Sequence, residues 1–219
     1  MEREEMIGLC KEHTLYTWSA MKDVNPLPIE RAEGVYVYEV GGKRHYDFNS
    51  QLMSVNIGHG HPKVIAAMKD QLDKLVYAFP GSATEPRARL GKKLAEHLPD
   101  PLNTVFFTLG GADANEHGIR MAKAYTGRSK IISRYRSYHG GTSGAIQMTG
   151  DPRRLPNESG SSGFVKVLDP WPYGYEFGQT EAEITEQSLR YLAEVIQMEG
   201  PETIAAMVVE TVTGTNGVL

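Results

Sequence analysis

Short apolar runs alternate with longer segments of helical periodicity from residue 104 to residue 210. The strand-like runs are TVFFTL (104–109), KIISRY (130–135), FVKVL (164–168) and TIAAMVVE (203–210), and the helical segments start near Ala112, follow YHGGTSG (138–144) and cover residues 181–198. This alternation is typical of β-α-β units, in which parallel strands form a sheet and helices cover both of its faces. The sequence therefore predicts an α/β fold with a mostly parallel sheet flanked by helices.

The part of the chain before residue 100 predicts a β-hairpin followed by two helices. Residues alternate in character on both sides of Gly41-Gly42 in GVYVYEVGGKRHYDFN (34–49), which indicates a hairpin in a small N-terminal subdomain. A helix is predicted from Pro62 and another from about Thr84, because apolar residues recur at helical spacing in both. These apolar positions are Val64, Ile65, Met68, Leu72 and Leu75 in the first helix and Leu90, Leu94 and Leu98 in the second.

The composition argues against several classes of function. The net charge of -4 disfavours binding to a phosphate backbone, so no nucleic-acid partner is expected. No stretch approaches the roughly 20 apolar residues of a membrane span, and the first residues lack a signal-peptide core. The single Cys10 cannot form an internal disulfide. His59 and His61 lack a third ligand nearby, so no metal site is predicted. We expect a cytoplasmic protein with no membrane partner.

Three of the predicted strands end in residues that suit ligand binding. Ligands of parallel sheets bind at the carboxyl ends of the strands, where Gly110-Gly111, residues 134–140 and Glu210 fall. Gly110, Gly111 and Ala112 leave the N–H groups and the positive end of the next helix open, which suits a phosphate. The same glycines also suit a tight turn without a ligand. The stretch matches neither a Walker loop nor a GxGxxG fingerprint, so neither ATP nor NAD is indicated.

Tyr138 and His139 follow the second predicted strand and precede two glycines. Tyr138 suits either stacking on a planar heteroaromatic ligand or burial as an aromatic side chain with a polar tip. His139 is interpreted as a structural hydrogen-bonding residue and not as a base. The position of Glu210 leaves open whether its carboxylate faces the site or the solvent.

Together these segments resemble the class III (subgroup II) aminotransferases, which are pyridoxal-phosphate (PLP) enzymes of fold type I that act on ω-amino acids and amines. The family's Ser-Gly-Ser-Glu-Ala-Asn-Glu pattern corresponds to GGADANE (110–116), where glycine and alanine replace the serines and aspartate replaces the first glutamate. NIGHGHPKV, AYTGR, YHGGT and VVETVTGTNG match family segments in the same order, so the resemblance covers nearly the whole chain. SRYRSYHGGT, GDPRR and ETVTGTNGVL further resemble the branch that contains taurine:pyruvate aminotransferases.

The resemblance implies a PLP site. The phosphate-binding turn of the family corresponds to residues 110–112, where the backbone N–H donors remain but the serine hydroxyl contact is lost at Ala112. Tyr138 would stack on the pyridine ring, and His139 would support its loop. Glu210 would match the family glutamate that lies near the ring hydroxyl.

The resemblance also implies a substrate pocket and a partner chain. Leu52 and Met53 fall where the family lines its pocket for a small-molecule amine and a keto acid, and Trp18 is expected to join them. For Trp18 and Met53, ordinary core packing is the alternative. Family members are homodimers, and residues 77–86 are expected to reach across the interface. Residues 1–60 would belong to the small domain and residues 61–219 to the first part of the large PLP-binding domain.

The chain contains no match to two residues that the family chemistry needs. These are the lysine that forms a Schiff base with PLP and the aspartate that protonates the pyridine nitrogen, and both follow the Glu210 segment in the family. No catalytic residue is therefore assigned in this chain, and we expect an amino-terminal half, truncated before the lysine, with an incomplete large domain. The expected enzyme moves an amino group from an ω-amino acid or amine, taurine-like or β-alanine-like, to a keto acid such as pyruvate. The alternative is a non-catalytic fragment that acts only as a binding or complementing half.

Overall fold

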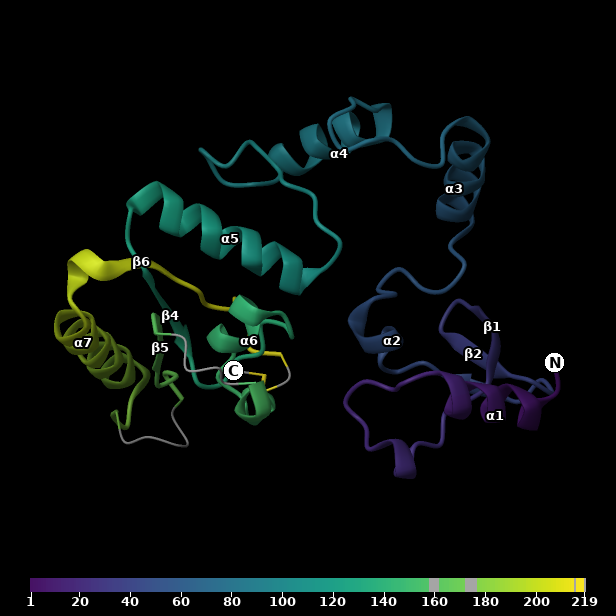
Figure 1. Ribbon diagram of the computed structural model, residues 1–219, viewed down its shortest axis with the longest axis horizontal. Coiled ribbons are helices and arrows are strands. Elements are labelled where there is room, and N and C mark those ends of the chain that lie inside the picture. The colour runs from purple at the N-terminus through teal and green to yellow at the C-terminus, as the bar shows by residue number, and fades with distance from the viewer. Residues whose placement is uncertain (158–161, 172–176, 215, 219) are drawn as a thin grey trace. The chain divides into compact units, whose positions relative to one another are not determined.

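The computed structural model describes residues 1–157, 162–171, 177–214 and 216–218 (Figure 1). The chain divides into two compact units, residues 1–90 and 91–219, each with a sheet of its own. The predicted domain boundary after residue 60 stays a prediction, because it refers to the domains of the family and not to the compactness of this chain.

The first unit contains a three-stranded antiparallel sheet in the order β1-β2-β3. Its strands are β1 (Ile29–Glu33), β2 (Tyr36–Glu39) and β3 (Arg44–Tyr46). The predicted hairpin is confirmed as β2 and β3, and Gly41 and Gly42 in its turn have φ values of +92° and +84°. Glycine adopts such values without strain, which explains why the chain reverses at this point. Strand β1, which pairs with β2, was not predicted from the sequence.

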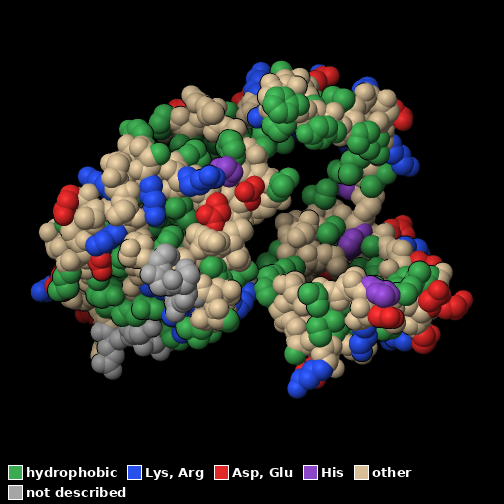
Figure 2. All heavy atoms as spheres, viewed as in Figure 1, with side chains coloured by type: hydrophobic (Ala, Val, Ile, Leu, Met, Phe, Trp, Pro, Cys, Tyr) green, Lys and Arg blue, Asp and Glu red, His purple; other side chains and the backbone are tan. Residues whose placement is uncertain are grey.

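The predicted helices of the first unit form, but their apolar faces are not covered. The helices that lie or begin in this unit are α1 (Arg3–His13), the 3-10 helix η1 (Met21–Asp23), α2 (Ser50–Met53), α3 (Pro62–Lys74) and α4 (Glu85–Ala95). Met68 and Leu72 on α3 are each 58% exposed, and Leu90 on α4 is also exposed. Figure 2 shows apolar side chains on the surface along both helices. The two segments with helical periodicity are therefore helices, but their apolar side chains are not buried as they normally are in an amphipathic helix.

The second unit contains a three-stranded parallel sheet in the order β5-β4-β6 (Figure 1). The strands are β4 (Lys130–Arg134), β5 (Phe164–Val167) and β6 (Ile204–Met207). The helices are α5 (Gly111–Thr126), α6 (Ser143–Met148), α7 (Glu181–Glu199) and the 3-10 helices η2 (Pro152–Asn157) and η3 (Pro201–Thr203). Strand β4 is central, and its Ile131 and Ile132 are fully buried. The predicted alternation of parallel strands and helices is confirmed.

The core of the second unit holds α5 and α6 against the sheet. Ile119 of α5, Ile131 of β4 and Met148 of α6 form a buried apolar cluster. Helix α5 ends at Gly127, which has a left-handed backbone with φ of +69° and donates its N–H to the Lys123 carbonyl. A glycine is favoured in this position because a side chain is strained there. The apolar cluster thus packs α5 against the sheet, and Gly127 ends the helix.

The prediction of a strand at residues 104–109 is wrong. This segment pairs with no strand in the described part of the chain, and Phe106 is exposed, as is Leu109. A strand forms only where a neighbouring strand completes the ladder of N–H and C=O groups, and local sequence does not supply that neighbour. Helix α5 therefore follows an unpaired segment and not the end of a strand.

Candidate functional site

The carboxyl ends of the three parallel strands bring Arg134, Asp169 and Glu210 together. Arg134 ends β4, Asp169 follows β5 and Glu210 follows β6. Arg134 Nη2 donates to the carbonyl oxygen of Glu210 at 3.1 Å, and Arg134 Nε lies 3.4 Å from Asp169 Oδ1. Residues 134–140 and Glu210 thus converge as expected for a parallel sheet. Asp169, which is buried, was not predicted, although it directly follows the apolar run FVKVL and the same strand-end rule applies to it.

The first turn of α5 is open to solvent. Gly110 is the N-cap residue, Gly111 is the first residue of the helix, and both are exposed. A Cβ atom added to either glycine would meet no atom within 4 Å. The first N–H groups of a helix have no partner within the helix, and the helix dipole adds positive potential there. This end of α5 can therefore bind an anion such as a phosphate.

Side chains of α5 tie its first turn to the loop that carries Tyr138 and His139. Asn115 Nδ2 donates to the His139 carbonyl at 2.7 Å. Glu116 Oε1 accepts hydrogen bonds from the N–H groups of Gly144 at 2.6 Å and Ala145 at 3.1 Å. These contacts make the helix start and the loop one connected unit.

Gly140 allows the same loop to approach α5 closely. Its φ is +131°, and a Cβ atom in its place would lie 2.4 Å from Ala112 Cβ and 2.8 Å from Ala112 Cα. Atoms at such distances overlap, so the loop can lie this close to the helix only with glycine at this position.

Tyr138 is half-buried, and both its backbone and its ring contact neighbouring side chains. Its N–H donates to Glu210 Oε1 at 3.4 Å. The guanidinium carbon of Arg153 lies 3.9 Å from the centre of the Tyr138 ring, and Arg153 Nε is bound to both carboxylate oxygens of the buried Asp151 at 2.9 and 2.8 Å. A cation over an aromatic face stabilises that arrangement. Arg153 and Asp151 were not assigned from the sequence, although both belong to the segment GDPRR.

His139 is buried, and its backbone is held by its neighbours. Its N–H donates to Thr149 Oγ1 at 2.9 Å. Burial lowers the pKa of the His139 imidazole, the negative charge of Glu210 raises it and the positive charge of Arg134 lowers it, so the pKa lies below the ordinary value. The ring is therefore neutral at pH 7. Within the described residues, His139 Nε2 and Glu210 Oε2 are buried and have no hydrogen-bond partner.

The residues predicted to line a substrate pocket belong to the first unit. Leu52 is 46% exposed, and Trp18 and Met53 are each 59% exposed. Trp18 and Met53 are thus exposed in the described chain, and the choice between a pocket and ordinary core packing stays a prediction. Leu52 and Met53, with φ of 58° and 60°, belong to a run of positive φ values from Ser50 to Met53, and Trp18 separately has a φ of 58°. Such backbone strain is frequent where a side chain serves a ligand. Their role in a pocket stays a prediction.

Of the two histidines in the segment GHGHP, His59 has a side-chain partner, whereas His61 Nδ1 is buried without a hydrogen bond among the described residues. His59 Nε2 lies 2.7 Å from Asp47 Oδ2, and the His59 and Gly34 backbones exchange two hydrogen bonds. No group of three or more His, Cys, Asp or Glu side chains suited to a metal ion occurs among the residues that the structure describes. No helix in the described ranges combines the length and the apolar character that crossing a membrane requires.

Comparison with known proteins gives one consistent result. The family aminotransferase class-III matches residues 18–219. The gamma-aminobutyrate transaminase 1, mitochondrial, of Oryza sativa subsp. japonica is 34% identical over 209 residues, which cover 90% of this chain and 40% of the relative. The taurine:2-oxoglutarate aminotransferase from Bifidobacterium kashiwanohense, solved in complex with PLP and glutamate, is 41% identical with a TM-score of 0.93, over 100% of this chain and 50% of that one.

A second solved structure agrees with the first. The (S)-enantioselective omega-transaminase from Thermomicrobium roseum is 34% identical with a TM-score of 0.94, over 100% of this chain and 51% of that one. The chain thus spans about 40 to 50% of the length of these relatives. The predicted α/β fold of type I, with its parallel sheet and its small N-terminal antiparallel sheet, is confirmed. The chain belongs to the class-III aminotransferase family.

Proposed function

We propose that the protein uses PLP to transfer an amino group from an ω-amino acid or amine to a keto acid. The observation that carries this proposal is the connected unit formed by the first turn of α5, the loop with Tyr138 and His139, and Glu210. An open helix N-terminus suits a phosphate, an aromatic ring suits a pyridine, and a carboxylate suits a ring hydroxyl. The hydrogen bonds that connect these three features support the proposal.

The residues present fit this cofactor. Gly110 and Gly111 leave the end of α5 accessible, while Ala112 offers an N–H group but no hydroxyl. Buried polar atoms without a partner call for a ligand, and Glu210 Oε2 and His139 Nε2 are such atoms within the described residues. When bound, PLP carries the amino group covalently and takes up electrons from the substrate carbon.

The roles that we assign to this chain are binding and orientation. The N–H groups of residues 110–112 would hold the phosphate, and Tyr138 would cover the ring. Glu210 Oε2 would accept a hydrogen bond from the ring hydroxyl. His139, which is neutral at pH 7 because burial lowers its pKa, would support the loop without adding a charge beside the ring.

For the substrates, we propose a taurine-like or β-alanine-like donor and a keto acid such as pyruvate, with Trp18, Leu52 and Met53 in the pocket. The donor is supported by the 41% identity to a taurine aminotransferase and by the segments SRYRSYHGGT and GDPRR. That relative is named for 2-oxoglutarate, so the two keto acids are the alternatives to compare. The rice relative is named for gamma-aminobutyrate, which is the third donor to compare.

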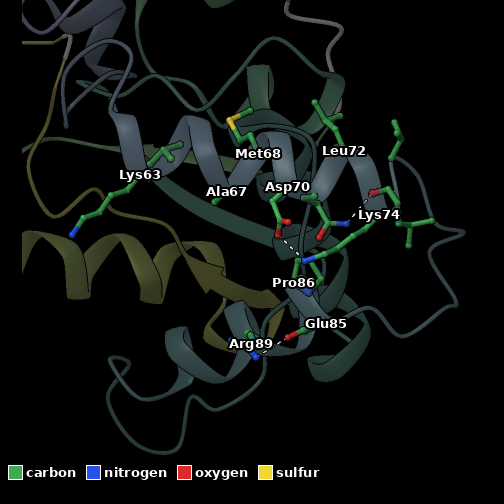
Figure 3. A pocket seen from close by; sticks show the side chains of 13 residues that line it. Lys63, Ala67, Met68, Asp70, Leu72, Lys74, Glu85, Pro86 and Arg89 are labelled. Atoms are coloured by element: carbon green, nitrogen blue, oxygen red, sulfur yellow. Dashed lines mark hydrogen bonds and ion pairs between the residues drawn. The ribbon is translucent and has the colours of Figure 1, made fainter.

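We also propose that the protein works as a homodimer. Helix α3 and the start of α4 line a groove of about 800 Å³, with apolar side chains such as Met68 and Leu72 along it (Figure 3). Two ion pairs accompany these apolar residues, Lys74 with Asp70 and Arg89 with Glu85, each at 2.6 Å. An exposed apolar surface with a polar rim is typical of a protein interface. Residues 77–86 remain the predicted segment that reaches across it, and Tyr77 and Phe79 within it are exposed.

The first experiment measures PLP binding and amino transfer by the protein as its gene encodes it. PLP binding is followed by visible absorption in wild type and in Tyr138→Leu, which removes the ring hydroxyl and the aromatic face. Thr149→Ser, which keeps the hydroxyl that binds His139, serves as the matched control. We expect about tenfold weaker binding in Tyr138→Leu and wild-type binding in the control. Equal binding in all three proteins would contradict the assigned site.

Product analysis then separates the substrates. Taurine, β-alanine and gamma-aminobutyrate are each supplied with pyruvate or 2-oxoglutarate, and the alanine or glutamate formed is quantified. Binding of PLP without any amino transfer would favour the predicted alternative, a binding or complementing half. Analytical sedimentation of the same sample measures its oligomeric state, for which we expect a dimer. A cytoplasmic location stays a prediction, since the rice relative is named as mitochondrial.

A further inference from the structure

Arg134 lies at the carboxyl end of β4, the one strand of the described parallel sheet that has a neighbour on each side. Its guanidinium therefore reaches across both neighbours. On the β6 side, Nη2 donates to the Glu210 carbonyl at 3.1 Å and to Thr213 Oγ1 at 3.2 Å. On the β5 side, Nε lies 3.4 Å from Asp169 Oδ1. One side chain thus joins the three strand ends that surround the site.

The environment of Arg134 leaves little freedom of movement. The side chain of Arg134 is 14% exposed, that of Asp169 is 1% exposed, and Thr213 is fully buried. Asp169 Oδ2 also accepts a hydrogen bond from the N–H of Arg136 at 2.9 Å. Because Arg134 Nε and Asp169 Oδ1 make no hydrogen bond within the described residues, this contact is an interaction between charges. A buried carboxylate of this kind requires a nearby cation.

The main chain of Arg134 is also held in place. Ser137 Oγ donates to the Arg134 carbonyl at 2.6 Å, and the N–H of Gly150 donates to Ser137 Oγ at 3.1 Å. A Cβ atom on Gly150 would lie 2.3 Å from the Arg134 carbonyl oxygen, so only glycine fits there. The main chain at the start of the turn from Arg134 to Tyr138 is therefore packed closely against Gly150.

Arg134 acts on both sides of the Glu210 carboxylate. It binds the backbone at Glu210 and the side chain at Thr213, so the segment between them is anchored at two points. The Glu210 carboxylate in turn accepts a hydrogen bond at Oε1 from the N–H of Tyr138. Arg134 Nη2 is 4.0 Å from Glu210 Oε2, which is near enough for charge attraction but too far for a hydrogen bond. The carboxylate is oriented while its Oε2 atom stays available.

We propose that Arg134 is a positioning residue for the cofactor site, which holds the Glu210 carboxylate and the Tyr138 turn in the arrangement that receives the ring of PLP. This inference rests on the proposed function, because the ligand is the same. It assigns to Arg134 no contact with the cofactor. Lysine cannot replace it, since a single ammonium group cannot reach Asp169 and the Glu210 segment at once.

The test compares Arg134→Lys with Arg128→Lys in the protein as its gene encodes it. Arg128 is a matched control, because it lies before the opposite end of β4 and donates to the carbonyls of Pro201 in η3 and Ile204 in β6 at 3.3 and 3.1 Å. We measure the dissociation constant of PLP, the circular dichroism of the bound PLP band, which reports its orientation, and the melting temperature. Arg134→Lys is expected to bind PLP about tenfold more weakly, with an altered dichroic band, while Arg128→Lys keeps both at wild-type values.

A second variant covers the case in which Arg134→Lys does not fold. The double variant Arg134→Gln with Asp169→Asn removes the buried cation and the buried Asp169 anion together, so Asp169 is not left as an unpaired buried charge. The same loss of PLP affinity and the same altered band are expected. A folded variant at Arg134 with unchanged affinity and band would overturn the inference while leaving the proposed function intact. Failure of the wild type to bind PLP would overturn both.

Discussion

Substitution of Gly140 by alanine is expected to separate the first turn of α5 from the Tyr138 loop. The new Cβ atom would lie 2.4 Å from Ala112 Cβ and 3.1 Å from Ala145 Cβ. Since carbon atoms in contact prefer about 3.5 to 4.0 Å, the overlap with Ala112 is about 1 Å. Overpacking of this kind costs about 1–3 kcal/mol, and the φ of +131° adds about 1–3 kcal/mol of backbone strain. The expected loss in free energy of unfolding is therefore about 2–6 kcal/mol.

Two other glycines serve as controls for Gly140→Ala in urea unfolding. Gly127→Ala shares a positive φ, at +69°, but meets no atom within 4 Å, so it reports backbone strain alone at about 1–2 kcal/mol. Gly141→Ala has an ordinary φ and only the Tyr138 hydroxyl at 4.0 Å, so its effect should stay within about 0.5 kcal/mol. If Gly140→Ala were no less stable than Gly127→Ala, the close approach to Ala112 would not limit this position, and the reasoning would be refuted.

Three further outcomes are expected. Thr180→Ala removes the capping box at the start of α7, where Thr180 and Glu183 bond each other's backbone, and should lower the free energy of unfolding in urea by about 1 kcal/mol. Glu116→Ala leaves two N–H groups of the α6 start unpaired and should cost about 1–3 kcal/mol, whereas Glu116→Gln, which keeps an acceptor, should cost less. The hydrogen bond from His59 lowers the pKa of Asp47, so its stabilisation is present above the ordinary 3.8 and is lost as the pH falls through the lowered pKa. Urea unfolding at decreasing pH should show this loss in wild type and a smaller one in His59→Gln.

Local signals in the sequence predict most of the elements. Pro62 starts α3, Gly41 and Gly42 form the hairpin turn, and the apolar runs from residue 130 onward become β4, β5 and β6. These features depend on backbone preferences and on periodicity within a few residues, which any sequence displays directly. The same signals failed for residues 104–109, because the pattern was present but no partner strand accompanies it in the described chain.

Local sequence signals predict only part of the candidate site. Gly110 and Gly111 at the start of α5, and Tyr138 and His139, stand out because they follow predicted strands or begin a predicted helix. Arg153, which lies over the Tyr138 ring, and Asp151, which binds Arg153, carry no such local signal. Their role depends on how the chain after α6 packs against the Tyr138 loop. A role that depends on contact between residues far apart in the sequence can be recognised only from the tertiary structure.

The sequence by itself determined the α/β class, the helix starts and the turns, and through its ordered motifs the resemblance to the family. Only the tertiary structure decided that Arg134 lies between Asp169 and Glu210, since this depends on the strand order β5-β4-β6. Strand order follows from the packing of segments far apart in the chain, with their hydrogen bonds and buried surfaces satisfied together. Local sequence specifies what each segment can form, and packing specifies which residues meet.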